Sequence, residues 1–392
     1  MNHFSAEADR LIEGCDRIVS REQLIEKLAE KRPLRIKLGV DPTSPDIHLG
    51  HSVVLDKMRQ FQDAGHEVIL IIGNFTAMIG DPSGRSATRP QLTHEEVMEN
   101  ARTYQEQAFK ILLHERAKVI CNGDWLAKMT YSDVIRLNSR VTLQQMLQRD
   151  DFRNRLDKSL PIHVHEIQYP IMQGWDSVKI ESDLELGGTD QLFNNLVGRE
   201  LQKEEGQSPQ CVMTMPILEG LDGKQKMSKS LGNYVALNET ATSMFGKLMS
   251  ISDELMARYY RILLREELSA DAHPMEAKKA LAQRIAERYH GVAAARQARE
   301  DFETRFAKRD LDSADLPTFQ ILADTPTDII SLIVSAFEKC FHIAKSRSDA
   351  RRLVVGGSVQ WRGEKISDPK AELPRDECGV LKLDKTHAVR IS

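Results

Sequence analysis

LRIKLGVDPTSPDIHLGHSVVLDKMRQFQDAGHEVILII, residues 34–72, is the stretch that decides the fold. Residues 34–40 read as a buried strand, and residues 68–72 are β-branched residues and leucine, as in a central parallel strand. Residues 51–64 between them carry apolar side chains at helical spacing. This strand–helix–strand order predicts a doubly wound α/β sheet that binds ligands at the carboxyl ends of its strands.

Composition limits the class of protein. The 392 residues are 41% hydrophobic and 29% charged, which is typical of a globular chain of two or three domains. No run approaches the roughly 18 apolar residues of a membrane span. The five cysteines are far apart and never form C-x-x-C, so we expect neither a disulfide framework nor a zinc ribbon, and we expect a cytoplasmic protein without a membrane partner.

Downstream of the first sheet unit the pattern changes several times. Residues 131–155 read as an amphipathic helical insertion, and the sheet pattern returns at 211–217. Residues 221–233 are polar, contain glycine and are rich in lysine, which predicts a loop. From about residue 238 the pattern is helical, and residues 309–326 lack periodicity and read as a linker.

The last part of the chain reads as a small α+β unit. Ile333, Phe337, Phe341 and Ala344 share one helix face, Ser348 is a candidate cap for a second helix, and a hairpin turns at Arg362–Gly363. Residues 330–392 contain 12 basic and 8 acidic residues, whereas the whole chain has a net charge of -4. A basic tail on an acidic body is suited to a polyanion, although an ordinary solvated surface has the same composition.

Two short motifs carry most of the chemistry. His48-Leu49-Gly50-His51 lies where the first loop enters a helix, and a helix N-terminus favours phosphate. Lys226-Met227-Ser228-Lys229-Ser230 lies in the predicted loop, where two lysines can close over a polyphosphate. Two histidines three residues apart lack the further ligands of a metal centre, so we expect no protein metal site.

Together these motifs resemble the paired signature of class I aminoacyl-tRNA synthetases. Four further blocks, in order, resemble the tyrosyl-tRNA synthetase family: KLGVDPT (37–43), IGDPSG (79–84), YPIMQGWD (169–176) and GGTDQ (187–191). Residues 348–368 are similar to an S4-type RNA-binding domain.

The resemblance implies the following roles. Residues for the ATP phosphates, the nucleoside and the leaving pyrophosphate are Thr43, His48, His51, Arg85, Arg89, Lys226, Lys229 and Ser230. Residues for tyrosine are Asp81, Tyr169 and Gln173 at the ammonium, Asp176 at the phenol, Gln191 near the carboxylate, and Lys37. Further ATP contacts are Asp41, Gly50, Gly188 and Asp190, and candidate RNA contacts in the tail are Lys345, Arg347, Arg351 and Arg352.

The chain departs from the usual family pattern at three positions. Lys37 replaces a tyrosine that helps to read the phenol, so Asp176 is left as the matched phenol reader. Glu185 stands where glutamine is frequent, and Trp175 where tyrosine is frequent.

The implied activity is the ligation of tyrosine to tRNA(Tyr) with ATP and Mg²⁺, by a homodimer. The implied order is a Rossmann-type catalytic domain (1–234) with a dimer-interface insertion (about 121–165) and a KMSKS loop (222–234), a helical anticodon-recognition domain (235–308), a linker (309–326) and an S4-like domain (327–392). A tryptophanyl enzyme of the same subclass and a non-catalytic RNA-binding protein on this scaffold are the alternatives.

Overall fold

The structure is a computed structural model that describes residues 3–43, 46–81, 93–269, 271–304, 316–321, 325–341, 343–375, 377–384 and 387–391. The chain divides into two compact units, Met1–Thr240 with Lys247–Leu281, and Ala241–Gly246 with Ala282–Ser392. Residues 247–281, which the sequence places in the helical domain, therefore belong to the first unit. None of the helices in the described ranges is long and apolar enough to cross a membrane.

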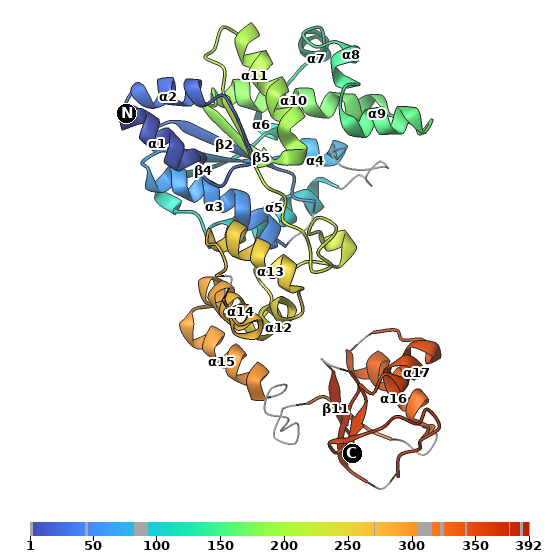
Figure 1. Cartoon of the computed structure of the whole chain (residues 1–392). Coiled ribbons are helices and arrows are strands. Elements are labelled where there is room, and N and C mark those ends of the chain that lie inside the picture. Colours follow the sequence, from blue (N-terminus) through green and yellow to red (C-terminus); the bar gives the residue numbers. More distant parts are fainter. Residues whose placement is uncertain are drawn as a thin grey trace. The chain divides into compact units, whose positions relative to one another are not determined.

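A six-stranded sheet forms the centre of the first unit, in the order β1-β6-β5-β2-β3-β4 (Figure 1). Its strands are β1 (Arg17–Val19), β2 (Arg35–Val40), β3 (Glu67–Ile72), β4 (Ala117–Cys121), β5 (Leu184–Gly188) and β6 (Cys211–Met215). Strands β2 to β6 are parallel, and β1 pairs with β6 in the antiparallel direction at one edge. The predicted doubly wound parallel sheet is therefore confirmed.

Helices surround this sheet. Those of the first unit are α1 (His3–Ile12), α2 (Arg21–Ala29), α3 (Leu49–Asp63), α4 (Thr76–Ile79), α5 (His94–Ala108), α6 (Gly123–Leu126), α7 (Tyr131–Asn138), α8 (Leu143–Met146), α9 (Asp150–Asp157), α10 (Val164–Ile180), α11 (Leu192–Glu204) and α13 (Asp253–Tyr259). The predicted insertion over 131–155 is thus three short helices of eight, four and eight residues.

The switch point of the sheet lies between β2 and β5. From β2 the chain runs through α3 to β3, and from β5 it runs through α11 to β6, so the two connections leave in opposite directions along the sheet. Right-handed crossovers then require α3 and α11 to lie on opposite faces, as Figure 1 shows. A crevice for a ligand opens between the carboxyl ends of such diverging strands.

Helices α10 and α11 pack closely because glycine meets glycine between them. A Cβ on Gly174 would lie 2.9 Å from the backbone nitrogen of Gly198. A Cβ on Gly198 would lie 2.8 Å from the Ser177 hydroxyl. Any larger residue would push the helices apart. This contact brings the functional face of α10 close to the first turn of α11.

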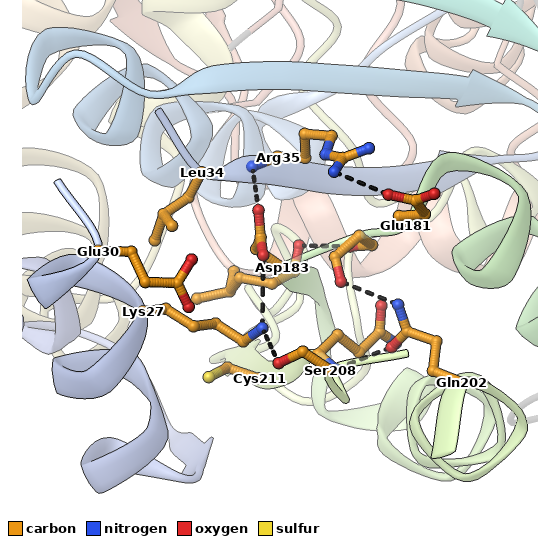
Figure 2. A network of polar contacts seen from close by, with 12 residues as sticks. Lys27, Glu30, Leu34, Arg35, Glu181, Asp183, Gln202, Ser208 and Cys211 are labelled. Atoms are coloured by element: carbon orange, nitrogen blue, oxygen red, sulfur yellow. Dashed lines mark hydrogen bonds and ion pairs between the residues drawn. The ribbon is translucent and has the colours of Figure 1, made fainter. Parts of the chain in front are cut away.

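The opposite end of the sheet is held by a polar network around Asp183 (Figure 2). Its carboxylate accepts hydrogen bonds from the Lys27 ammonium at 3.3 Å, from both terminal nitrogens of Arg32 at 2.7 Å, and from the Arg35 backbone N–H at 2.9 Å. The Asp183 side chain is buried, and these donors hold the pKa of its carboxyl below the usual value, although burial by itself raises it. The network joins α2 and β2 to the start of β5.

The rest of the chain is helical and then mixed. Helices α12 (Ala241–Met249), α14 (Pro274–His290) and α15 (Val292–Phe302) are followed by α16 (Ile329–Phe341) and α17 (Arg347–Val355). A five-stranded sheet has the order β7-β11-β10-β8-β9, formed by β7 (Thr318–Phe319), β8 (Gln360–Trp361), β9 (Glu364–Lys365), β10 (Gly379–Lys382) and β11 (Ala388–Ile391). The hairpin predicted at Arg362–Gly363 is confirmed, since both residues have positive φ between β8 and β9.

Two predictions for the tail are wrong in detail. Thr318 and Phe319, assigned to the linker, form β7, which pairs with β11, and Phe319 is buried in the core of the small sheet. A strand of two residues is too short to show the alternating pattern of a strand in the sequence, and it is recognised only by its pairing with β11. The helix cap is Ser346 rather than Ser348, because the Ser346 hydroxyl accepts from the Asp349 backbone N–H.

Candidate active site

A cavity of about 300 Å³ lies at the switch point, bounded by the residues that follow β2 and β5. Most of the predicted site residues line it: Asp41, Thr43, His48, Gly50, His51, Asp81, Tyr169, Gln173, Asp176, Gly188, Asp190, Gln191 and Lys226. Residues from six separate stretches of the chain therefore meet in one place.

Some predicted residues lie elsewhere. Lys37, Lys229 and Ser230 do not line the cavity. The Ser230 hydroxyl is exposed and lies 2.9 Å from the Ser228 hydroxyl. Arg85 and Arg89 lie outside the described residues.

The two histidines of the first motif are held as neutral donors. His48 caps α3, and its Nδ1 accepts from the Gly50 backbone N–H at 3.2 Å, while His51 Nδ1 accepts from the His48 backbone N–H at 3.3 Å. Burial lowers the pKa of His48 to about 2 and that of His51 to about 4. Since each Nδ1 is an acceptor, each Nε2 carries the proton and can donate to a phosphate oxygen.

Asp176 is a buried carboxylate on α10 with two neutral donors. Its Oδ1 accepts from Trp125 Nε1 at 2.9 Å and its Oδ2 from Asn122 Nδ2 at 3.2 Å. Only 2% of the residue is exposed, and burial raises the pKa of its carboxyl to about 6. Asn122 and Trp125 both follow β4, so the segment after this strand orients the Asp176 carboxylate, which belongs to α10.

Tyr169 and Asp41 form a second pair. The Tyr169 hydroxyl donates to Asp41 Oδ2 at 2.8 Å, and the Thr76 hydroxyl donates to Asp41 Oδ1 at 2.8 Å. The phenol proton of Tyr169 is therefore directed at Asp41, and a phenol oxygen is also a hydrogen-bond acceptor. Gly73 makes room for this arrangement, since a Cβ there would lie 2.0 Å from Asp41 Oδ1.

The side-chain amides of the site are oriented by Asn194. Its Nδ2 donates to Gln173 Oε1 at 3.0 Å and to Gln191 Oε1 at 3.2 Å. Gln191 Nε2 in turn donates to Asp81 Oδ2 at 2.8 Å. Asn194 thus connects residues that the resemblance assigns to the ammonium and to the carboxylate of one substrate.

The lysines of the KMSKS loop are paired with carboxylates. Lys226 Nζ lies 3.1 Å from Asp190 Oδ2, and Lys229 Nζ lies 2.9 Å from Asp46 Oδ2. All four side chains are partly exposed, so each pair is weak in water and open to competition from an anion.

Lys37 does not reach the cavity as a phenol reader. Its ammonium lies 2.8 Å from Glu185 Oε1, and neither side chain is more than 1% exposed. Two of the three departures from the family pattern are therefore in contact with each other.

The candidate RNA contacts in the tail differ in their surroundings. Lys345 Nζ lies 5.1 Å from the centre of the Phe337 ring, and Arg347 pairs with Asp328 at 3.4 Å. Arg352 pairs with Asp349, whereas Arg351 is exposed and lines a shallow surface hollow together with Arg347.

Sequence reasoning missed several residues of the site: Gly73, Thr76, Asn122, Trp125, Asn194 and Arg149, whose guanidinium donates to Asn194 Oδ1. Asn122 could have been found, because it is a polar residue directly after a strand of the parallel sheet. The others act through contacts between distant segments and leave no local pattern. Among the described residues, no group of three or more His, Cys, Asp and Glu side chains could hold a metal ion.

The chain is similar to known tRNA synthetases. The family model described as tRNA synthetases class I (W and Y) matches residues 29–307. The tyrosine–tRNA ligase of Oleidesulfovibrio alaskensis is 47% identical, over 97% of both chains, and that of Thermotoga maritima is 49% identical, over 96% of this chain and 94% of the other.

Solved structures show the same fold. The tyrosyl-tRNA synthetase of Archaeoglobus fulgidus, complexed with L-tyrosine, has a TM-score of 0.61 and 25% identity, and the match covers 75% of this chain and 99% of that one. A truncated mitochondrial tyrosyl-tRNA synthetase from Aspergillus nidulans has a TM-score of 0.63 at 21% identity, covering 78% and 95%. The chain therefore belongs to the class I tRNA synthetases of the tryptophan and tyrosine group.

Proposed function

We propose that this chain is a tyrosine–tRNA ligase. The observation that carries this function is the meeting, in one cavity, of a buried carboxylate suited to a phenol with neutral histidines and a lysine suited to phosphates. The relatives that match nearly the whole chain carry the same name. Its substrates are L-tyrosine, ATP and tRNA.

The amino acid is bound by acceptors matched to its donors. Asp176 accepts the phenol proton, and Asp81, Tyr169 and Gln173 offer oxygen atoms to the three N–H bonds of the ammonium. The support for this assignment is that all four line the cavity. A tryptophanyl alternative is disfavoured, because the relatives that match nearly the whole chain are named tyrosine–tRNA ligases.

Activation joins tyrosine to AMP. The tyrosine carboxylate attacks the α-phosphorus of ATP, the bond from that phosphorus to the bridging oxygen breaks, and pyrophosphate leaves with the electron pair. The site acts by alignment and by stabilising charge, and no side-chain nucleophile is required. His48 and Thr43 bind the ATP phosphates, with His48 donating from Nε2. His51 helps to hold the nucleoside, and Gly50, Gly188 and Asp190 complete the nucleotide site.

The KMSKS loop supplies mobile positive charge. Lys226 leaves Asp190 and Lys229 leaves Asp46, and both lysines then bind the pyrophosphate. Asp190 can then contact the ribose. Arg85, Arg89 and Ser230 are assigned to the same phosphates by resemblance. Mg²⁺ accompanies ATP and is held by phosphate oxygens and water rather than by a protein cage.

In the second reaction a hydroxyl of the terminal adenosine of tRNA(Tyr) attacks the tyrosyl carbonyl carbon, and AMP leaves. Residues 235–308 recognise the anticodon, and the tail (327–392) binds RNA through Arg351, Arg347, Arg352 and Lys345. Three of these are exposed arginines on one helix, α17, which is suited to phosphate contacts that do not read sequence.

The protein acts as a homodimer through its helical insertion. The support is a group of exposed large apolar side chains in this part of the chain: Tyr131, Ile135, Leu143, Leu156 and Val164. A cytoplasmic location is supported by the five cysteines, all of which are free thiols.

Pyrophosphate exchange with each of the twenty amino acids tests the activity. Exchange driven mainly by tyrosine is the expected result. Exchange driven by tryptophan would establish the other enzyme of the group, and no exchange with any amino acid would establish a non-catalytic protein.

A further inference from the structure

Lys37 and Glu185 face each other across the switch point of the sheet. They are directly paired in the register of β2 and β5, the two strands whose carboxyl ends bound the active-site crevice. Lys37 Nζ lies 2.8 Å from Glu185 Oε1, with 0% and 1% of the two side chains exposed. Apolar side chains of similar volume are often as stable as a buried ion pair, so stability alone does not account for charge at this position.

The pair contacts the helix that carries the amino-acid site. Lys37 Nζ donates to the Gln173 backbone oxygen at 2.9 Å and to the Ser177 hydroxyl at 2.7 Å. The Ser177 hydroxyl donates to Glu185 Oε2 at 3.0 Å. Gln173 and Ser177 flank Asp176 on α10, so the ion pair docks the turn of helix that presents both the amide for the ammonium and the carboxylate for the phenol.

Lys37 and Glu185 are also the charged residues that shift the pKa of Asp176. Burial raises the pKa of this carboxyl to about 6, the Lys37 charge lowers the pKa, and the Glu185 charge raises it. Among the described residues, the other groups that act on Asp176 are the uncharged donors Asn122 and Trp125. Two opposite charges therefore act on one acceptor from adjacent strands.

We propose that Lys37 and Glu185 are positioning residues for the tyrosine site, a charge-balanced pair that docks α10 on the sheet and sets the electrostatic potential at the Asp176 carboxylate. Neither residue contacts the substrate. The inference rests on the proposed function, because it concerns the residue assigned to the phenol.

The test uses the full-length chain and the dissociation constant of L-tyrosine, measured by equilibrium dialysis without ATP between pH 5 and pH 8.5. Tyrosine binding weakens at acid pH as Asp176 becomes protonated, and we call this part of the pH profile the acid limb. Lys37→Met removes the positive charge, so the midpoint of the acid limb should rise by about one pH unit. This is the low end of the shift that a neighbouring charge produces. At pH 6 this corresponds to roughly fivefold weaker binding than in the wild type, with equal affinity at pH 8.5.

The substitution of Glu185 should shift the pH dependence of tyrosine binding in the opposite direction. Glu185→Gln keeps an acceptor for Ser177 and removes the negative charge, so the limb should move to lower pH. Lys37→Met combined with Glu185→Gln removes both charges and should place the limb between the wild-type and the Lys37→Met positions, because Lys37 has the larger effect on Asp176.

Lys27→Met is the matched control. Lys27 is also a buried lysine in an ion pair, with Asp183 at 3.3 Å (Figure 2), but neither residue lines the cavity. It should lower the unfolding temperature and leave the pH dependence of binding unchanged. If Lys37→Met and Glu185→Gln leave the limb in place, or if Lys27→Met moves it equally, the inference is wrong. A wild-type chain that binds no tyrosine would instead refute the proposed function.

Discussion

The Arg149 guanidinium donates a hydrogen bond of 2.8 Å to the amide oxygen of Asn194. Arg149 comes from the helical insertion, and Asn194 is the residue whose amide nitrogen orients Gln173 and Gln191. Arg149 Nε and Nη2 also donate to the Asp151 carboxylate at 2.9 Å, which fixes the orientation of the guanidinium that contacts Asn194. The insertion therefore orients the amino-acid site through one buried side chain.

Arg149→Met should raise the KM for tyrosine about tenfold with little change in kcat, since a lost orienting bond to a buried amide is worth about 1.4 kcal/mol. Steady-state pyrophosphate exchange measures both constants. Arg153→Met, at an exposed arginine of the same segment, is the control and should leave the KM unchanged. Equal effects of the two substitutions would contradict the role of Arg149.

Lys229→Ala should slow adenylate formation strongly and leave tyrosine affinity nearly unchanged, because charge on the leaving pyrophosphate is greatest in the transition state. Stability should change by less than about 1 kcal/mol, as the pair with Asp46 is partly exposed. Stopped-flow measurement of adenylate formation checks the rate. Lys224→Ala in the same loop is the control, and a loss confined to tyrosine affinity in Lys229→Ala would refute the assignment.

Asp176→Ala should reduce tyrosine activation much more than phenylalanine activation, because the tyrosine phenol adds a third donor to this buried carboxylate and phenylalanine supplies none. The ratio of the two kcat/KM values should narrow by roughly a hundredfold, which corresponds to about 3 kcal/mol. Tyrosyl-tRNA synthetases are themselves the standard worked example of such discrimination, so only the assignment of the effect to Asp176 is specific to this chain. Lys37→Met, measured at pH 8.5, should keep the ratio within about threefold, and a collapse of the ratio there would make Lys37 the phenol reader.

Asp183→Asn should destabilise the first unit by about 3 kcal/mol at pH 7, because it leaves the buried Lys27 ammonium without its charged partner. The pKa of this carboxyl is lowered in the folded chain, so its contribution is present above the unfolded pKa near 4 and is lost as the pH falls through the lower folded value. Urea unfolding at pH 7 and at pH 3 measures this. The difference between wild type and variant should shrink at pH 3, whereas the exposed Asp157→Asn control should show little difference at either pH.

A chain of residues 1–315 should form tyrosyl-adenylate at the wild-type rate and charge tRNA poorly, most clearly at high salt, because phosphate contacts by the tail are lost. The end point lies before β7, which belongs to the small C-terminal sheet. Charging across a salt series, with pyrophosphate exchange as the internal control, checks this. Equal charging by both chains at every salt concentration would sink the assignment of RNA binding to the tail.

The sequence by itself determined the fold class and the positions of the motifs. The strand–helix–strand pattern of residues 34–72 predicts the switch-point sheet, because apolar periodicity is set by which side chains must be buried. The blocks around His48, Asp176 and Asp190 predict a shared site by resemblance, and the structure brings their side chains into one cavity.

Only the tertiary structure decided which side chains support these residues. Lys37 with Glu185, Arg149 with Asn194, and Trp125 with Asp176 are each separated by 45 residues or more. A lysine in an apolar strand carries no signal of its partner, because the partner is selected by strand order and register rather than by neighbours in the chain. The buried carboxylate of Asp176 has its raised pKa for the same reason, since burial and neighbouring charges exist only after the strands and α10 have packed together.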